Sequence, residues 1–249
     1  MKIERIMPGM GIRSNVGTMG VAGVTLIRDD VNVLVDTGHF GTRNVVKEEF
    51  ARRKMSPRDI DVVVLTHLHW DHVLNVDMFG DAKIVVGEKE LKEGILLEDD
   101  KRFDRAFKSL LRGMDVRTVN DGDRVSKHAR ALITPGHSPG HVSLVVDGVA
   151  HGPAVFSGDA VPNFRAYLRG FPDFSFYDQA QARESVAAIR RLNPGVIYPG
   201  HDSPFNEKGY IERDDFTLIL RRENEENSLV TIRHVTADQP VIKDPPRSR

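Results

Sequence analysis

The sequence contains no cysteine, which removes every site that depends on a thiol. Disulfides, cysteine nucleophiles and sulfur-ligated metal sites are therefore excluded, and any metal ion must be held by histidine and carboxylate. Neither sign of charge is in excess, because the sequence contains 35 Lys and Arg residues and 36 Asp and Glu residues. A net charge of -1 provides no broad basic surface, so no nucleic acid partner is expected.

Long apolar runs are missing as well. No stretch of about 18 apolar residues is available to span a bilayer, and the N-terminal residues lack the apolar segment of a signal peptide. We therefore expect a cytoplasmic protein with no membrane partner. The chain of 249 residues is long enough for one large core, and no change in composition marks a boundary. We expect a single domain over 1–249, with the Pro-rich stretch 237–249 as a flexible tail.

Apolar patterns and turn residues predict strands and helices in an irregular order. Strands are expected in a hairpin at 23–38 and at 60–64, 82–87, 130–136, 141–148, 153–159 and 195–201. Helices are expected at 42–54, 72–79, 98–113 and 178–192. Strands grouped towards both ends of the chain, with helices between them, indicate packed sheets that helices cover.

Polar side chains gather where the apolar run at 60–64 ends. The sequence LTHLHWDH places His67, His69, Asp71 and His72 within six residues. Side chains two residues apart in an extended segment point the same way, so His67 and His69 can reach one ion. A turn after Trp70 would direct Asp71 and His72 to a second point nearby. The spacing therefore indicates two neighbouring metal sites.

Three later segments share one pattern, in which an apolar run and a glycine precede a histidine or aspartate. They are ALITPGHSPGH with His137, AVFSGDA with Asp159, and VIYPGHD with His201. Glycine allows the backbone to turn sharply and to approach a metal closely at a strand end. These residues are the remaining candidate ligands.

In this order, THLHWDH, TPGHSPGH, FSGD and YPGHD resemble the motifs of the metallo-β-lactamase superfamily, and DTG at 36–38 matches its early hairpin. The resemblance covers nearly the whole chain. It implies an α/β fold, the αβ/βα four-layer sandwich of two mixed β-sheets flanked by helices. It also implies that one metal ion is held by His67, His69 and His137, the second by Asp71, His72 and His201, with Asp159 bridging them.

Two divalent metal ions are the expected cofactors. Zinc is the first choice, and iron and manganese suit the same ligands. Asp36 and His141 are expected to orient ligating residues rather than to bind metal. The other histidines have no motif around them, so surface or packing roles are expected for His39, His128, His151 and His234.

The expected activity is hydrolysis of an ester-type bond in a small molecule, with a bridging hydroxide as nucleophile. Asp71 is the candidate proton carrier. Lactones, esters and phosphoesters fit, with promiscuous phosphotriesterase activity. The alternatives are a thioester hydrolase of the glyoxalase II type, a phosphodiesterase or nuclease, a mononuclear iron sulfur dioxygenase, and a non-catalytic metal-binding domain. The resemblance is also compatible with a homodimer.

An aromatic segment at 163–178 is the candidate substrate lid. The predicted pocket residues are Phe164, Phe171, Phe174, Phe176 and Tyr177. Acyl-homoserine lactonases of the family typically carry a catalytic Tyr three residues after the bridging Asp, where this sequence has Pro162. Tyr167 is the candidate that could replace it from the same segment.

Overall fold

The computed structural model describes residues 1–14, 17–93, 109–220 and 228–232, which belong to two compact units, Met1–Ile211 and Glu212–Arg249. The described part of the second unit contains one antiparallel pair, β15 (Phe216–Leu220) with β16 (Ser228–Ile232). The expected tail at 237–249, and most of the helix expected at 98–113, lie outside the described residues. The single-domain interpretation therefore stays a prediction.

The first unit is built on two six-stranded mixed sheets. The first sheet has the order β1 (Lys2–Met7), β4 (Val24–Arg28), β5 (Asn32–Val35), β6 (Val62–Val64), β7 (Lys83–Gly87) and β8 (Asp115–Val119). The second has the order β14 (Gly209–Tyr210), β13 (Phe205–Asn206), β12 (Val196–Pro199), β11 (Ala154–Gly158), β10 (Val142–Val146) and β9 (Ala129–Ile133). From β5 to β8 the first sheet is parallel, whereas in the second only β11 and β12 are parallel.

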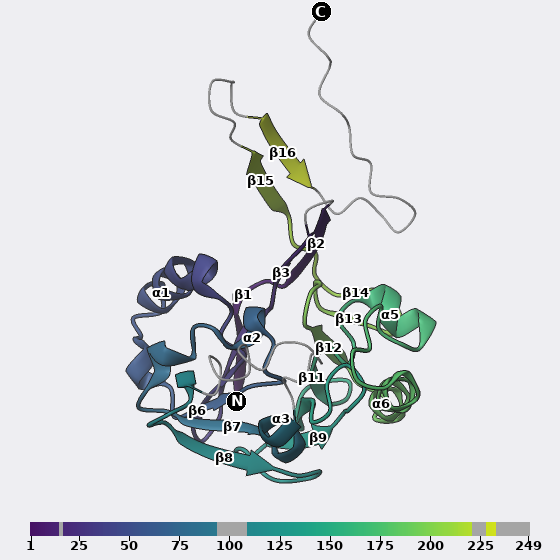
Figure 1. Cartoon of the computed structure of the whole chain (residues 1–249), viewed down its shortest axis with the longest axis horizontal. Helices are drawn as coiled ribbons and strands as arrows, with labels where there is room; N and C mark the ends of the chain where they lie inside the picture. Colours follow the sequence, from purple (N-terminus) through teal and green to yellow (C-terminus); the bar gives the residue numbers. More distant parts are fainter. Residues whose placement is uncertain (15–16, 94–108, 221–227, 233–249) are drawn as a thin grey trace, which may run out of the picture. The chain divides into compact units, whose positions relative to one another are not determined.

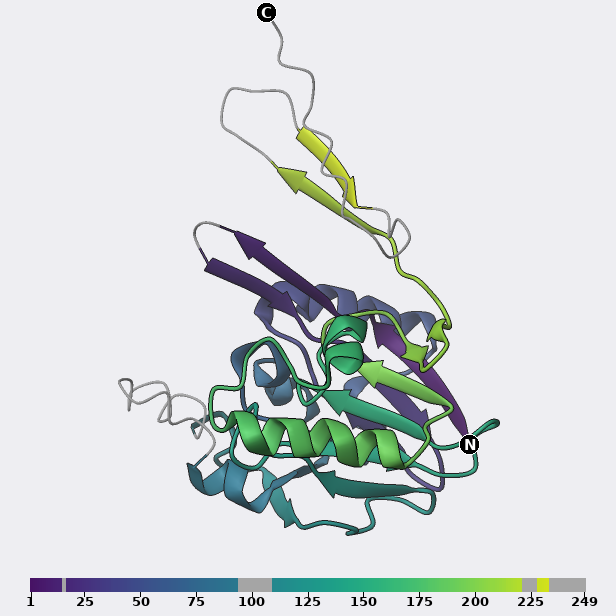
Figure 2. The same ribbon diagram turned by 90° about the vertical axis from the view of Figure 1, so that its right-hand side faces the viewer.

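Helices cover the outer face of each sheet (Figure 1). In α1 (Arg43–Arg52), Val46 and Phe50 are buried on the outer side of the first sheet. Helices α5 (Phe164–Arg169) and α6 (Gln179–Arg191) cover the second sheet, and Figure 2 shows α6 lying across its outer face. The predicted fold class, two mixed sheets flanked by helices, is confirmed.

Strand residues alternate between two apolar layers, as the period of two requires. In β6, Val63 packs in the outer core with Phe50, while Val64 packs in the inner core between the sheets with Leu144. All three valines of this strand are buried. The inner core holds the two sheets together, and the candidate ligands follow the strands that form it.

The sequence patterns missed the N-terminal strands, including the hairpin of β2 (Met10–Ser14) and β3 (Gly17–Val21). Glycine is depleted in strands because it has no side chain to pack, so a glycine-rich stretch is typical of a loop. The helix expected at 72–79 is divided into α2 (Trp70–Val73) and the 3-10 turn η3 (Val76–Phe79). Among the described residues, no helix is long and apolar enough to cross a membrane.

Shorter elements complete the unit. They are the 3-10 turns η1 (Phe40–Thr42) and η2 (Pro57–Asp59) and the helix α3 (Glu88–Glu93). Ser56 and Asp59 form a reciprocal capping box at the start of η2. Helix α3 follows directly on β7, without an intervening loop.

Candidate metal centre

The seven residues predicted as ligands converge at one end of the two sheets. They follow the carboxyl ends of β6, β9, β11 and β12, so each half of the unit supplies part of the cluster. Three overlapping groups have potential ligand atoms that all lie within 4.8 Å of one another: His67, His69 and His137; His67, His72 and Asp159; and Asp71, His72 and His201.

Asp159 lies between the two ends of this cluster. Its Oδ2 is 3.3 Å from Nε2 of His137, and its Oδ1 is 3.3 Å from Nε2 of His201. At the outer ends, Nε2 of His137 is 2.9 Å from Nδ1 of His69, and Nε2 of His201 is 3.4 Å from Oδ2 of Asp71. One carboxylate therefore faces both halves of the cluster.

The donor atoms of the cluster are suited to binding cations. Within the described part of the chain, Nε2 of His67, Nε2 of His72 and Oδ1 of Asp159 are buried without a hydrogen-bond partner. Such atoms are costly unless something satisfies them. All three belong to one of the groups above, and imidazole nitrogen with carboxylate oxygen suits zinc, iron and manganese.

Asp36, which was predicted to orient ligating residues, is hydrogen-bonded to His72 and Thr66 beside the cluster. Its Oδ2 accepts a hydrogen bond from Nδ1 of His72 at 2.8 Å, and its Oδ1 accepts one from the backbone N–H of Thr66 at 2.8 Å. The Thr66 hydroxyl is 2.9 Å from Oδ2 and 3.1 Å from Nδ1 of His67. The backbone of Asp36 is left-handed, with φ of 56°. These bonds leave Nε2 of His72 free to face the centre.

His141 orients Asp159 rather than joining the ligand groups. Its Nε2 accepts a hydrogen bond from the backbone N–H of Asp159 at 3.0 Å, so its proton is on Nδ1, which donates to the Thr134 hydroxyl at 2.9 Å. The Thr134 hydroxyl is in turn 2.9 Å from that of Ser143. This buried chain fixes the ring that holds the turn after β11.

Backbone carbonyls fix two further rings. Nδ1 of His137 donates to the carbonyl of Phe174 at 2.8 Å, and Nδ1 of His201 donates to the carbonyl of Val21 at 3.2 Å. A carbonyl can only accept, so each bond places the proton on Nδ1 and leaves the lone pair of Nε2 directed at the cluster.

The pKa values of the clustered histidines are shifted in opposite directions. Burial, followed by repulsion from neighbouring histidines, holds the pKa of His67 and His69 well below the usual range, so both are neutral. Burial also opposes charge on His72, yet the carboxylates of Asp36, Asp71 and Asp159 raise its pKa to about 10. Binding of a cation at His72 must therefore displace a proton.

Residues of the aromatic segment differ in their contacts with the cluster. The ring of Phe176 lies 5.4 Å from that of His69 and 5.3 Å from that of His137, and Phe174 is stacked on Phe176 at 5.6 Å. Phe174, Phe176 and Tyr177 are exposed. The ring of Phe171 instead contacts the guanidinium groups of Arg169 and Arg183, whose Cζ atoms lie 4.2 Å and 4.0 Å from its centroid.

Two predicted residues pack in the core outside the second sheet. Tyr167 is 8% exposed, with its ring 5.4 Å from Phe205 and the Arg190 guanidinium 4.9 Å from the ring. Phe164 is 4.9 Å from Phe205 in the same cluster. The structure gives Tyr167 these packing contacts, and its proton-transfer role stays a prediction.

The remaining histidines lie in different surroundings. His39, for which a surface or packing role was expected, has its ring 5.1 Å from that of Trp70 in a tilted arrangement. Burial lowers the pKa of His39, and attraction to Asp71 opposes this effect, so His39 stands beside the cluster. His128 bonds to Asp29 at 2.7 Å, away from the cluster, and His234 lies outside the described residues.

Glu90 was missed by the sequence analysis. It is completely buried, and its carboxylate bonds to two of the four loops that carry candidate ligands, those after β6 and β9. Burial raises its pKa to about 7, although three hydrogen bonds favour the ionised form. No spacing rule points to it, because it lies in an ordinary charged stretch, EKELKE.

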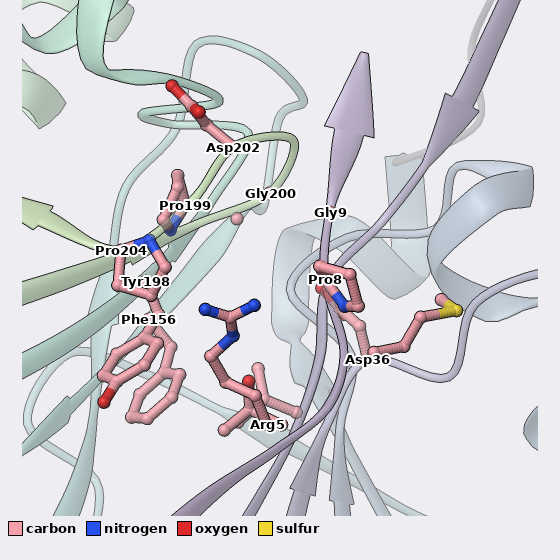
Figure 3. Close-up of a pocket in the computed structure, with 15 residues that line it drawn as sticks. Arg5, Pro8, Gly9, Asp36, Phe156, Tyr198, Pro199, Gly200, Asp202 and Pro204 are labelled. Carbon is pink, nitrogen blue, oxygen red and sulfur yellow. The ribbon is translucent and has the colours of Figure 1, made fainter. Parts of the chain in front are cut away.

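A small cavity lies between the sheets behind the cluster. Figure 3 shows the Arg5 side chain between the two sheets, with Phe156 and Tyr198 on the side of the second sheet. The cavity measures about 20 Å³, and its lining includes Asp36 and Gly158 but none of the seven candidate ligands. A space of this size holds about one water molecule, so it is too small for a substrate.

Comparison with known proteins gives consistent matches. The sequence profile of the metallo-beta-lactamase superfamily matches residues 18–201. A probable metallo-hydrolase of Methanocaldococcus jannaschii is 30% identical over 170 residues, which cover 68% of this chain and 70% of that protein. Metallo-beta-lactamase domain-containing protein 1 of Xenopus laevis is 30% identical, covering 73% and 71%. The crystal structure of a quorum-quenching N-acyl homoserine lactone lactonase has a TM-score of 0.65 at 21% identity, covering 81% of this chain and 92% of that one.

Proposed function

This chain belongs to the metallo-beta-lactamase superfamily and is a metal-dependent hydrolase, and we propose that it cleaves a lactone or another carboxylic ester at a centre of two divalent ions. The observation that carries the proposal is the convergence of seven donors with three buried, unsatisfied ligand atoms among the described residues. A non-catalytic binding domain would not need so many donors in one cluster.

The ligand groups suggest how the ions are shared. We assign one ion to His67, His69 and His137, and the other to Asp71, His72 and His201. Asp159 would be shared by both ions, because its two oxygens face Nε2 of His137 and Nε2 of His201. Zinc is the proposed metal, since a histidine-rich donor set with carboxylates is typical of its hydrolytic sites.

When bound, the two ions supply Lewis acidity that lowers the pKa of a water molecule and polarises the oxygen of the scissile group. Side chains of the chain itself transfer the proton and hold the ligands in position. Oδ2 of Asp71 lies 3.4 Å from Nε2 of His201, and from this position its carboxylate can accept the proton of the attacking water and pass it to the leaving group. His141 and Asp36 keep Asp159 and His72 in place.

The aromatic wall supports the substrate class. The edge-on Phe176, backed by Phe174, provides an apolar surface beside His69 and His137, which suits the acyl chain of an ester or lactone. The lactone lactonase among the structural matches supports the same class. Pro162 occupies the position of the expected lactonase tyrosine, so the proton-handling residues here would differ from that pattern.

The decisive experiment combines metal analysis of the purified protein with a panel of lactone, thioester, phosphodiester and phosphotriester substrates. Two equivalents of zinc and turnover of lactones or esters would support the proposal. One equivalent of iron with oxygen consumption would instead indicate a sulfur dioxygenase, and preferred thioester cleavage would indicate the glyoxalase II type.

Two variants test the assigned proton carriers. Asp71→Ala should lose most of the turnover, and an Asp71→Ala protein that kept both metals and full activity would remove Asp71 from the mechanism. Tyr167→Phe tests the tyrosine. Unchanged turnover on every substrate of the panel would assign Tyr167 to packing alone.

A further inference from the structure

Glu90 is a buried carboxylate placed between two ligand-bearing loops. It is the third residue of α3, and its side chain has no exposed surface. Figure 1 shows α3 beside β7, close to β9 of the other sheet. Burying a carboxylate is costly unless it gains strong hydrogen bonds, so its contacts indicate what it does.

Each oxygen of Glu90 serves a different loop. Oε1 accepts a hydrogen bond from the backbone N–H of Leu68 at 3.0 Å. Oε2 accepts one from the Ser138 hydroxyl at 2.7 Å and one from the backbone N–H of Gly140 at 2.9 Å. Leu68 lies between His67 and His69, and Ser138 follows His137. The three donors therefore flank the three histidines assigned to one ion, and the hydrogen bonds of the Glu90 carboxylate go to neighbours of those histidines in the chain.

The loop of His137 is also fitted closely to the backbone around Glu90. A Cβ atom at Gly140 would lie 1.8 Å from the backbone nitrogen of Glu90, and one at Gly87 would lie 2.0 Å from the carbonyl oxygen of Gly140. No side chain fits between these segments. The position of the loop is therefore set by the junction of β7 and α3, and the carboxylate of Glu90 fixes its register.

We propose that Glu90 is the positioning residue of the three-histidine group, holding the His67–His69 segment and the His137 loop at the separation that one ion requires. This inference rests on the proposed two-ion function. Asp36 fixes His72 directly, whereas Glu90 acts through the backbone on either side of the ligands. The protein thus uses two buried carboxylates, one for each ion.

The substitution Glu90→Gln tests this role with little change in volume. All three partners are donors, and a carboxamide offers one oxygen and one NH₂ group in place of two acceptor oxygens. Either Leu68 or the Ser138–Gly140 pair then faces a donor. Misplaced supporting groups of this kind cost about 10–100-fold in metal affinity.

The measurement is zinc affinity by chelator competition in two backgrounds that each keep one ion. His201→Ala leaves the three-histidine group, and His69→Ala leaves the group of Asp71, His72 and His201. We expect Glu90→Gln to weaken zinc binding about 10–100-fold in the His201→Ala background and less than threefold in the His69→Ala background. Equal losses in both backgrounds, or no loss in either, would overturn the proposal.

Two further variants separate positioning from general damage. Ile84→Val, in the buried part of β7, should lower the thermal midpoint without changing either zinc affinity. If Glu90→Gln does not fold, Ser138→Ala removes only one of the three bonds and should give a smaller loss, confined to the His201→Ala background. A wild-type protein that binds fewer than two zinc ions would refute the two-ion function, while the His201→Ala comparison would still decide the role of Glu90.

Discussion

Replacing Asp36 with asparagine should disable one half of the metal centre while leaving the fold intact. The backbone at this position is left-handed, with φ of 56°, and asparagine is among the residues that tolerate this conformation best. The amide oxygen can keep the bond from the Thr66 N–H. The NH₂ group then replaces the oxygen that accepts from Nδ1 of His72 at 2.8 Å.

This change acts on the tautomer of His72. An NH₂ group donates to Nδ1 and so moves the imidazole proton to Nε2, the atom that faces the centre. The expected loss of zinc affinity is about 10–100-fold, which corresponds to about 1.4–2.8 kcal/mol. In the metal-free protein, the loss of a buried charge-assisted bond should lower the free energy of unfolding by about 1.5–3 kcal/mol.

Zinc competition in the single-ion backgrounds is the assay. The loss should occur in the His69→Ala background, where the remaining ion depends on His72, and be small in the His201→Ala background. Asp29→Asn is the matched control, because Asp29 bonds to His128 at 2.7 Å far from the cluster. It should lower stability without changing zinc affinity. An Asp36→Asn protein that bound two zinc ions with wild-type affinity would refute this reasoning.

Three other predictions concern separate parts of the molecule. Gly20→Ala should weaken zinc binding at Asp71, because a Cβ atom there would lie 2.5 Å from Oδ2 of that residue, whereas Gly11→Ala on the paired strand meets only an ordinary 3.7 Å contact and serves as the control. Phe176→Ala should raise KM severalfold for long-chain lactones and less for short-chain ones, and an equal change for both would exclude an acyl-chain contact. Hydrogen bonds from His128 and Ser126 outweigh burial and hold the pKa of Asp29 well below its usual range, so its contribution to stability is present above its unfolded pKa of about 3.9 and is lost as the pH falls below it. The difference in thermal midpoint between wild type and Asp29→Asn should therefore shrink at acidic pH, and a constant difference would contradict it.

The sequence predicted the family and the fold class, and both are confirmed. These predictions succeeded because the chemistry lies where strands stop. Polar residues such as His67 and Asp159 stand out against the apolar runs before them, and glycines mark the sharp turns. The grouping of predicted strands towards both ends of the chain, with helices between them, likewise indicated packed sheets that helices cover.

Other features depend on contacts between distant segments, which spacing does not encode. Glu90 acts through backbone groups of two loops, so nothing near it in the sequence reveals its partners. The strands β2 and β3 are glycine-rich where Gly20 leaves room for Asp71, and composition alone reads them as loop. The aromatic segment was predicted as a unit, yet Phe176 faces the histidines while Tyr167 turns into the core.

The division of the candidate ligands between the two sheets links metal supply to the lifetime of the protein. A cation held by His67 from one sheet and Asp159 from the other ties both halves together in addition to the inner apolar core. Free zinc at a hundred times its dissociation constant would add about 2.7 kcal/mol to the free energy of unfolding. Starvation for the bound metal should therefore shorten the half-life of the protein under proteolysis, so that a cell poor in that metal loses the enzyme itself as well as its activity.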